Sequence, residues 1–410
     1  MQRTYIIRTA LNIKRGVFMI ERDKSCEIPG RPGDSDLEIC EFIPEWPAGS
    51  GKTFAGKAPQ LKSELKNIDL DSAVNLTLPK AFFGITGCEC RIILNNLVVL
   101  HNKNQLQFKV TSPVGTVSGG VWRYTADQPG RYPMAIEVCD RAGRQLGFAE
   151  TEIIISDSNA GNDQNISMLM IGDSLFAKGE AATFLLENMR AHGNPNFYLL
   201  GSHSGAGKPL EAGKAAVEAY GGWRWGHFLE KYEAGTAYNA KSKFLKQEAN
   251  GTLKLDFNGY LEKYHQGKVP DVIVILLGCN DIAHACNEDF ERWMSASRSH
   301  RKQLLDHIRE NAPGAIIGLV TLPPANLRNK AYVENYHGNV VLQQFAYNQI
   351  AYVKQLLLDY QDDPEYSIVP IYQAVDGMED FPVDNAIHPA PGGYSNFALA
   401  IENWLKSLFA

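Results

Sequence analysis

The sequence predicts an α/β protein in two parts, with an all-β first half and a second half built on a parallel sheet. Three observations lead to this fold class. Short apolar runs that alternate with polar residues, separated by turns, dominate before residue 160. A polar, turn-rich segment lies at 156–164, and beyond it strand and helix patterns alternate, as in a parallel sheet covered by helices.

The first half, residues 1–158, is expected to form a β-sandwich. Leu106, Phe108 and Val110 alternate with polar neighbours, which places their side chains on one face of a strand. Several short strands at such spacing are typical of a sandwich. The role of residues 1–65 stays open, because their Pro and Gly content predicts loops with a strand or two. Further strands are predicted at 121–126, 132–138 and 148–155.

The second half, residues 163–410, is expected to form a parallel sheet with helices on both faces. The run at 272–278 is apolar throughout, as in a central strand that is buried on both faces. Functional sites of such sheets lie beyond the carboxyl ends of the strands. The strands are predicted at 168–172, 272–278, 315–321 and 367–372, and the helices at 178–192, 300–311, 340–360 and 394–408.

The composition of the 410-residue chain is that of a folded protein, with 44% hydrophobic and 21% charged residues. A net charge of -6 without a basic run argues against nucleic-acid binding. No apolar stretch approaches the roughly 18 residues of a membrane span. The motif PAGSGKT at 47–53 resembles a phosphate loop, but Trp46 stands where its first Gly belongs, so nucleotide binding is not expected.

The seven cysteines leave at least one thiol unpaired. Cys88 and Cys90 lie two apart on a predicted strand and therefore point to the same face, as small buried residues. No Cys-x-x-Cys pair or Cys/His cluster has the spacing of metal ligands, so no metal site is expected.

Ser174 in Gly172-Asp173-Ser174 directly follows the predicted strand 168–172. A serine at such a strand-to-helix turn has an exposed hydroxyl, and its main-chain N–H lies at a helix N-terminus, where negative charge is stabilised. The alternative is a serine that only caps the helix.

Asn280 in Gly278-Cys279-Asn280-Asp281 follows the strand 272–278 in the same way. An Asn side chain at this edge can donate a hydrogen bond to a developing oxyanion. The alternative is an Asn that makes a turn.

His388 in Asp384-Asn385-Ala386-Ile387-His388-Pro389 precedes the last predicted helix. An acidic residue a few positions earlier can hold its imidazole in one tautomer, and the imidazole can then accept a proton from a serine. A lone His is more often structural, but this one comes with an acid, a Pro and a Gly-Gly turn.

Together the three motifs resemble the SGNH hydrolases, also called GDSL esterases, over about residues 163–410. Ser174 in IGDSL, Asn280 in LGCND and His388 in DNAIHP match the first, third and fifth blocks of that family in order. The second-block Gly falls in AYGGWRW at 219–225, where Gly222 is favoured over Gly221. The resemblance implies a three-layer α/β/α, flavodoxin-like hydrolase domain.

The fifth block departs from the family pattern, which has Asp three residues before His. Asn385 stands there, and Asp384 lies one position earlier. We favour Asp384 as the residue that orients His388, because removing the charge of a triad acid can cost about four orders of magnitude in rate. Two alternatives stay open: Asn385 orients the imidazole without a charge, or a backbone carbonyl does so.

The resemblance implies acyl transfer without a cofactor. Ser174 attacks an ester carbonyl and His388 accepts its proton. The oxyanion is met by the N–H groups of Ser174 and Gly222 and by the side chain of Asn280. Because an unperturbed His titrates near about 6.5, activity is expected to fall at acid pH.

Family members that act on acetylated sugars often carry a comparable insert that ends in Gly-Trp, here at Trp223. The expected substrate is an acylated carbohydrate, above all an O-acetyl ester, or another small ester. Trp223 and Trp225 are expected to offer a flat face to a sugar ring, and core packing is the alternative for both. Two other functions stay open: a lipase or thioesterase with an apolar acyl tunnel, and a non-catalytic glycan-binding protein.

The first half resembles the Ig-like modules that precede some bacterial SGNH domains, on the stretch LPKAFFGITGCECRIILNNLVVL at 78–100 and the strands after it. This resemblance suggests an extracellular or periplasmic enzyme. No signal peptide is visible in MQRTYIIRTALNIKRGVFMIERD, so the compartment stays open.

Overall fold

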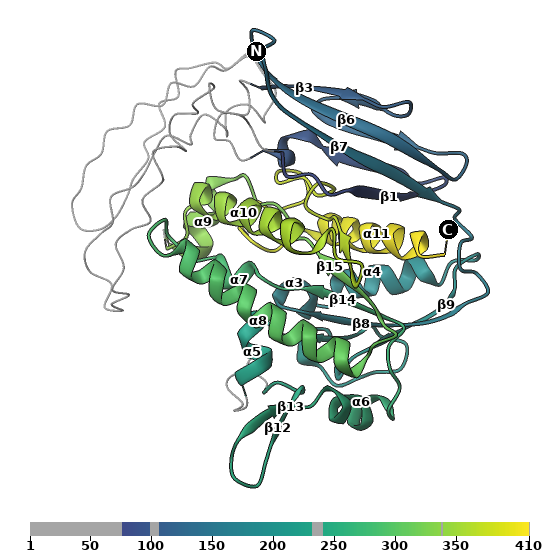
Figure 1. Cartoon of the computed structure of the whole chain (residues 1–410), viewed down its shortest axis with the longest axis vertical. Coiled ribbons are helices and arrows are strands. Elements are labelled where there is room, and N and C mark those ends of the chain that lie inside the picture. The colour runs from purple at the N-terminus through teal and green to yellow at the C-terminus, as the bar shows by residue number, and fades with distance from the viewer. Residues whose placement is uncertain (1–75, 99–105, 232–240, 338, 410) are drawn as a thin grey trace, which may run out of the picture.

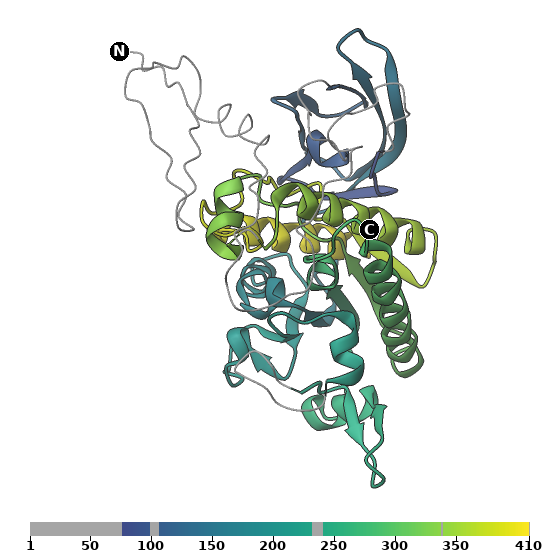
Figure 2. The ribbon, with the colours of Figure 1, turned by 90° about the vertical axis from the view of Figure 1, so that its left-hand side faces the viewer.

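The computed structural model describes residues 76–98, 106–231, 241–337 and 339–409, whose arrangement is shown in Figure 1. A β-sandwich lies against one side of an α/β unit, next to helix α11 (Pro391–Ser407). Figure 2 shows the same stacking from a second direction. The predictions for residues 1–65, including the segment 47–53, lie outside the described residues.

The sandwich consists of a four-stranded sheet in the order β1-β7-β6-β3 and a three-stranded sheet in the order β2-β5-β4. Ile92 and Trp122 from the smaller sheet share one buried core with Ile136 from the larger sheet. The predicted all-β character of the first half is therefore confirmed for its described residues, and its bounds and its kinship with Ig-like modules stay predictions. The strands are β1 (Ala81–Ile85), β2 (Glu89–Ile93), β3 (Leu106–Thr111), β4 (Thr116–Ser118), β5 (Val121–Thr125), β6 (Gly130–Asp140) and β7 (Gln145–Ser156).

The sheet of the α/β unit contains the parallel strands β9-β8-β14-β15-β16 in that order. Numbered along the chain, this is the 2-1-3-4-5 order of flavodoxin-like folds, so the predicted fold class is confirmed. Ile273, Val274 and Ile275 of β14 are buried, as a central strand covered on both faces requires. The strands are β8 (Asn165–Gly172), β9 (Asn196–Leu200), β14 (Val272–Leu276), β15 (Ile316–Val320) and β16 (Tyr366–Val369).

The insert before AYGGWRW also contributes to this sheet. β11 (Ala216–Ala219) pairs in parallel with the end of β8, and β10 (His203–Ser204) pairs antiparallel with β11. The first half of β8 pairs with β9 instead. The AYGGWRW segment therefore emerges directly beside the end of β8.

Helices cover both faces of the sheet. α4 (Glu180–Met189) packs with α11 on one face, and α8 (Phe290–Asn311) and α10 (Leu342–Tyr360) lie on the other. α8 begins well before the predicted helix 300–311. Its buried face continues from Met294 through the polar residues Ser297 and Arg301, so apolar spacing alone does not reveal this part of the helix. The shorter helices include α3 (Ser174–Ala177), α5 (Trp225–Glu230), α6 (Phe257–His265), α7 (Cys279–Ile282) and α9 (Asn329–Tyr336).

The segment 156–164, predicted as a linker, is fixed to the α/β unit by Lys406. This buried side chain of α11 donates to the carbonyls of Ser158 at 2.7 Å, Ala160 at 2.9 Å and Gly193 at 3.3 Å. A buried ammonium group is tolerated here because three oxygens replace its water. The sandwich is thus joined to the α/β unit by an anchored segment.

Replacing Lys406 with Met should lower the free energy of unfolding by about 2–4 kcal/mol, because three carbonyl oxygens then lose a charged donor in a buried place. Urea unfolding followed by circular dichroism measures the change. The control Lys302→Ala removes an exposed lysine that pairs with Asp306 on the same helix, and it should change the stability little. A Lys406→Met protein as stable as its parent would contradict the anchoring role.

Candidate active site

The turn after β8 presents Ser174 at the carboxyl edge of the sheet. β8 ends at Gly172, and Ser174 is the first residue of α3. Asp173 caps this helix, since its buried carboxyl group accepts the N–H of Leu175 at 3.0 Å. The cap is therefore supplied by Asp173, which leaves the half-buried Ser174 hydroxyl available for another partner.

Ser174 and His388 are in direct contact. His388 Nε2 lies 2.8 Å from Ser174 Oγ, although the two residues are 214 positions apart in the sequence. His388 reaches this place on the segment between β16 and α11, at the edge where open α/β sheets bind their ligands. The structure thus brings together the serine and the histidine of the predicted site.

Asp384 does not take part in this contact. Its side chain is exposed and makes no hydrogen bond or ion pair with any described residue. Asn385 instead accepts the main-chain N–H of Ile387 at 3.2 Å and that of His388 at 2.9 Å. This Asx turn orients the main chain of His388 and leaves Asp384 facing solvent. The prediction that Asp384 orients the imidazole is therefore wrong for this structure.

None of the acidic residues that the structure describes is hydrogen-bonded to the imidazole of His388. In the described part of the chain, its Nδ1 makes no hydrogen bond to a carboxylate or carbonyl oxygen. Burial lowers the pKa of His388 to about 4, and the ammonium group of Lys178 adds to this shift. The ring therefore stays neutral far below the ordinary value of about 6.5, and the expected fall of activity moves to a lower pH.

Asn280 ties three segments of the site together. Its Nδ2 donates to Asp173 Oδ2 at 3.2 Å and to the carbonyl of Trp223 at 3.0 Å. These bonds connect the turn after β8, the turn after β14 and the AYGGWRW segment. Because both N–H groups are engaged, the amide can donate to an oxyanion only by exchanging one of these bonds.

Gly222 lies in the AYGGWRW segment with φ +75°, a left-handed conformation that favours glycine. The N–H of Tyr220 donates to the carbonyl of Gly172 at 3.0 Å, which brings this segment next to the turn that holds Ser174. Gly222 is exposed, and its N–H donates to none of the described residues. The N–H can therefore bind an incoming oxygen, as the role of an oxyanion donor requires.

Trp223 and Trp225 are core residues, so the predicted flat face for a sugar ring is wrong. Both side chains are at most 1% exposed. Trp223 packs on Tyr220 with ring centroids 4.2 Å apart, and Trp225 Nε1 donates to the hydroxyl of Tyr352 at 2.8 Å. Burial of such large rings is strongly stabilising, which is why the alternative of core packing holds.

Two buried carboxyl groups, Asp173 and Asp281, lie beneath the site. Burial raises the pKa of each to about 7, and Asp281 adds to the shift of Asp173. The motifs did not predict this role, although each acid adjoins a predicted site residue at a strand end. A carboxyl group accepts the N–H of Leu175 in either protonation state, so the helix cap persists across this pH range.

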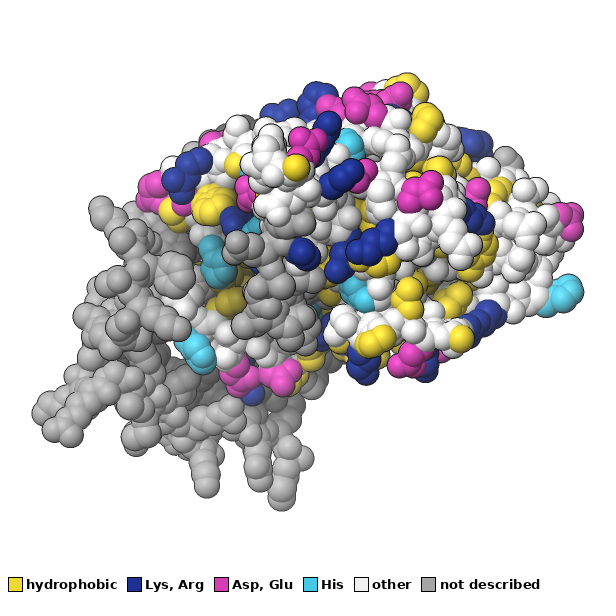
Figure 3. Space-filling model, turned by 90° about the horizontal axis from the view of Figure 1, so that it is seen from below, with side chains coloured by type: hydrophobic (Ala, Val, Ile, Leu, Met, Phe, Trp, Pro, Cys, Tyr) yellow, Lys and Arg dark blue, Asp and Glu magenta, His cyan; other side chains and the backbone are white. Residues whose placement is uncertain are grey.

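The described residues contain neither a cluster of metal-ligand side chains nor a membrane-spanning helix. No group of three or more His, Cys, Asp or Glu side chains among them is arranged to hold a metal ion. None of the described helices is both long and apolar enough to cross a membrane. Basic and acidic side chains are interspersed on the face seen in Figure 3, so that face has no continuous basic surface for nucleic acid.

An NMR titration of the His388 imidazole should give a midpoint near pH 4, because burial disfavours its charged form. The His388→Gln spectrum assigns the signal. Lys178→Ala should raise the midpoint only part of the way, since burial is the larger cause. A midpoint at or above the ordinary value of about 6.5 would show that an acid stabilises the charged ring.

The α/β unit is similar in sequence to a known family. A protein-family model described as GDSL-like Lipase/Acylhydrolase matches residues 168–401. No curated protein sequence matches the chain.

Several solved structures are similar to this chain over a little more than half of its length. A carbohydrate esterase family 3 protein from Talaromyces cellulolyticus is 15% identical with a TM-score of 0.39, covering 60% of this chain and 98% of that one. The family 3 carbohydrate esterase from Clostridium thermocellum is 14% identical with a TM-score of 0.35, covering 60% and 100%. A carbohydrate acetylesterase family member from Sinorhizobium meliloti is 14% identical with a TM-score of 0.38, covering 60% and 99%.

Proposed function

Because the chain belongs to the GDSL-like lipase/acylhydrolase family and is thus a carboxylic ester hydrolase, we propose that Ser174 and His388 form its catalytic pair. The observation that carries this proposal is the 2.8 Å separation of Ser174 Oγ and His388 Nε2. A hydroxyl at this distance from a neutral imidazole can pass its proton directly to the ring. The oxygen then becomes a nucleophile strong enough to attack an ester.

The proposed reaction runs in two steps. Ser174 Oγ attacks the ester carbonyl while His388 Nε2 takes its proton, and the protonated ring then gives this proton to the departing alcohol. Water, deprotonated by His388, attacks the acyl-enzyme and releases the acid and free Ser174. The N–H groups of Ser174 and Gly222 meet the oxyanion, and a single such donor is worth roughly 3–4 kcal/mol. Asn280 becomes a third donor if it releases Trp223.

The proposed pair works without an acid. In a triad the acid fixes the tautomer of the imidazole and stabilises its charged form. Here the Asx turn of Asn385 places the main chain of His388, and burial keeps the ring neutral. The pair is therefore available as a base at lower pH, but it binds the proton less tightly during the reaction.

We propose short acyl esters, above all O-acetyl groups on carbohydrates, as substrates. A long acyl chain needs an apolar tunnel that leads from the nucleophile. Cavities of about 280 Å³ beside Tyr264 and beside Phe83 are not lined by Ser174 or His388, so neither of them supplies such a tunnel. The carbohydrate part rests on the sequence resemblance, since the tryptophans expected to bind sugar are buried.

The parent protein should hydrolyse p-nitrophenyl acetate, and Ser174→Ala should lower kcat by at least about 10³-fold because no nucleophile remains. Release of p-nitrophenol, corrected for spontaneous hydrolysis, measures this. Ser118→Ala changes an exposed serine of β4 and should leave kcat unchanged. Lack of turnover on acetyl, butyryl and acetylated-sugar esters would refute the function. A preference for octanoyl esters would refute only the short acyl chain.

Asp384→Asn should change kcat/KM by less than about threefold, whereas loss of a triad acid's charge costs about four orders of magnitude. Asn385→Ala should cost about 10-fold or more in kcat, since it releases the main chain of His388. Initial rates with p-nitrophenyl acetate compare the two variants. A thousandfold loss in Asp384→Asn would mean that this acid reaches the imidazole during catalysis.

A further inference from the structure

The segment that carries His388 forms neither helix nor strand. It runs from residue 370, after β16, to residue 390, just before α11. Such a segment has no main-chain ladder of its own to hold a side chain in one place. The position of the imidazole therefore depends on contacts with other parts of the molecule.

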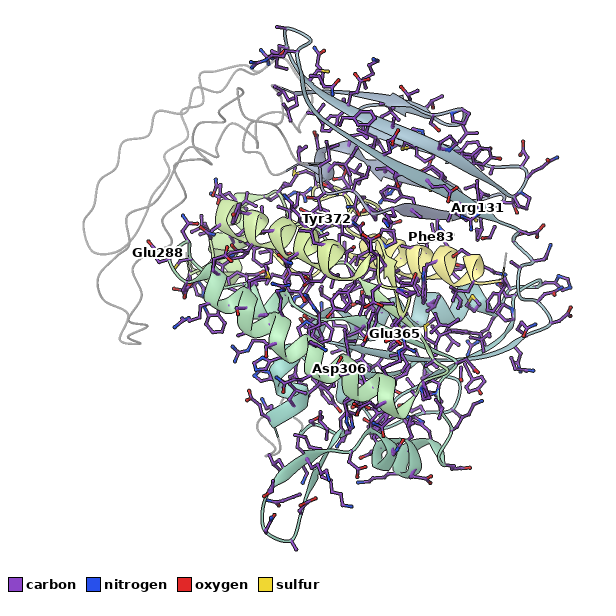
Figure 4. The ribbon with its side chains drawn as sticks, in the orientation of Figure 1. Phe83, Arg131, Glu288, Asp306, Glu365 and Tyr372 are labelled. Atoms are coloured by element: carbon purple, nitrogen blue, oxygen red, sulfur yellow. The ribbon has the colours of Figure 1, made fainter. Side chains whose placement is uncertain are left out.

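The sandwich holds the first part of this segment. The buried Asn96 donates to the carbonyls of Tyr372 and Val375, both at 2.8 Å. The main-chain N–H of Ile93 donates to the carbonyl of Gln373 at 2.8 Å. Tyr372 lies where the sandwich meets the helices of the α/β unit (Figure 4). The contact between the two units is thus made on the histidine-bearing segment itself.

Arg91 of β2 reaches the middle of the segment. Its Nη2 lies 2.5 Å from Asp380 Oδ2, and its Nε donates to the carbonyl of Ala374 at 2.8 Å. Asp380 is 7% exposed, so this charged pair is shielded from water far more than a surface ion pair is. One guanidinium group therefore joins two points of the segment to the sandwich.

Asp380 connects this anchor to His388. Its Oδ1 accepts Asn396 Nδ2 of α11 at 2.9 Å, and its carbonyl accepts the main-chain N–H of Ala390 at 2.9 Å. Ala390 lies two residues after His388 and caps α11. A movement of Asp380 is thus passed to the main chain next to the imidazole.

The α/β unit holds the same segment from a second side. Asn326 Nδ2 donates to the carbonyls of Pro382 and Asn385, both at 2.8 Å. Asn385 in turn binds the main-chain N–H of His388. The Asn326 and Asp380 contacts restrain the segment before and after His388 respectively, so losing either one removes part of what holds the imidazole in place.

We propose that the β-sandwich holds the catalytic histidine in place, with Arg91 acting through Asp380 as a positioning residue. This inference rests on the proposed function of Ser174 and His388. A misplacement of about 1 Å can cost about 10²-fold in rate, so a small loosening of the segment is enough. The hydrogen bonds of Arg91 to this segment go to Ala374 and Asp380 and not to an oxyanion donor, so its loss is expected to affect the reaction step more than substrate binding.

Arg91→Ala should lower kcat by about 10- to 100-fold with KM within about twofold, because the histidine shifts while the binding surface stays. Arg91→Lys, which keeps the charge and one donor, should recover part of the loss. The matched control is Lys80→Ala, since Lys80 pairs with Asp362 across the same boundary but outside the segment. It should leave kcat unchanged. If Arg91→Ala does not fold, Asp380→Asn tests the same ion pair, because it removes the carboxylate charge and keeps the shape of the side chain.

Hydrogen–deuterium exchange gives a readout that needs no turnover. The N–H groups of Asp376, Asp380 and Ala390 are bonded within the segment, so exchange at 376–390 should be faster in Arg91→Ala and unchanged in Lys80→Ala. In an active parent, unchanged kcat in folded Arg91→Ala overturns the proposal, as does faster exchange spread over the whole chain. If the parent is inactive and Arg91→Ala shows faster exchange only at 376–390, the proposed function is refuted, but the anchoring of this segment by Arg91 is supported.

Discussion

The active site depends on one hydrogen bond, between His388 Nε2 and Ser174 Oγ, which joins residues 214 positions apart. Local structure places only one of the two partners. Ser174 stands where β8 meets α3, beside the switch point of a 2-1-3-4-5 sheet. His388 arrives on an irregular segment, in which the carbonyl of Asp380 and the side-chain oxygen of Asn385 accept main-chain N–H groups. The relative position of the Ser174 and His388 side chains therefore depends on the packing around that segment.

Burial shapes the chemistry of this pair. It lowers the pKa of His388 and raises that of Asp173, so both groups are neutral over a wider range than in water. A neutral ring can accept a proton at once, but nothing described beside it stabilises the charge it then carries. In the proposed mechanism, His388 is thus a base that is available at low pH, and the stability of its charged form depends on the oxyanion opposite it. The proposed mechanism accordingly depends more on the main-chain donors at Ser174 and Gly222 than on stabilisation of the charged imidazole.

The sandwich and the α/β unit meet at the segment that carries His388, which has no helix or strand of its own to fix it. Lys406 anchors the chain between them, and Arg91 and Asn96 form hydrogen bonds to the histidine-bearing segment. A partly buried ion pair is stronger than an exposed one. Because two donors of one guanidinium group are engaged, its orientation is fixed as well. The described part of the sandwich is thereby connected to the segment that carries the proposed catalytic histidine.

The sequence by itself predicted the main strands and helices of the α/β unit and the order of the motifs. Period-two and strand-helix patterns depend on neighbours along the chain, and Ser174, Asn280 and His388 stand at predicted strand ends or before a predicted helix. Only the tertiary structure decided that Asp384 faces solvent and that Trp223 is buried. Those outcomes follow from contacts between residues far apart in the sequence, and no local pattern encodes which distant side chain fills a given space.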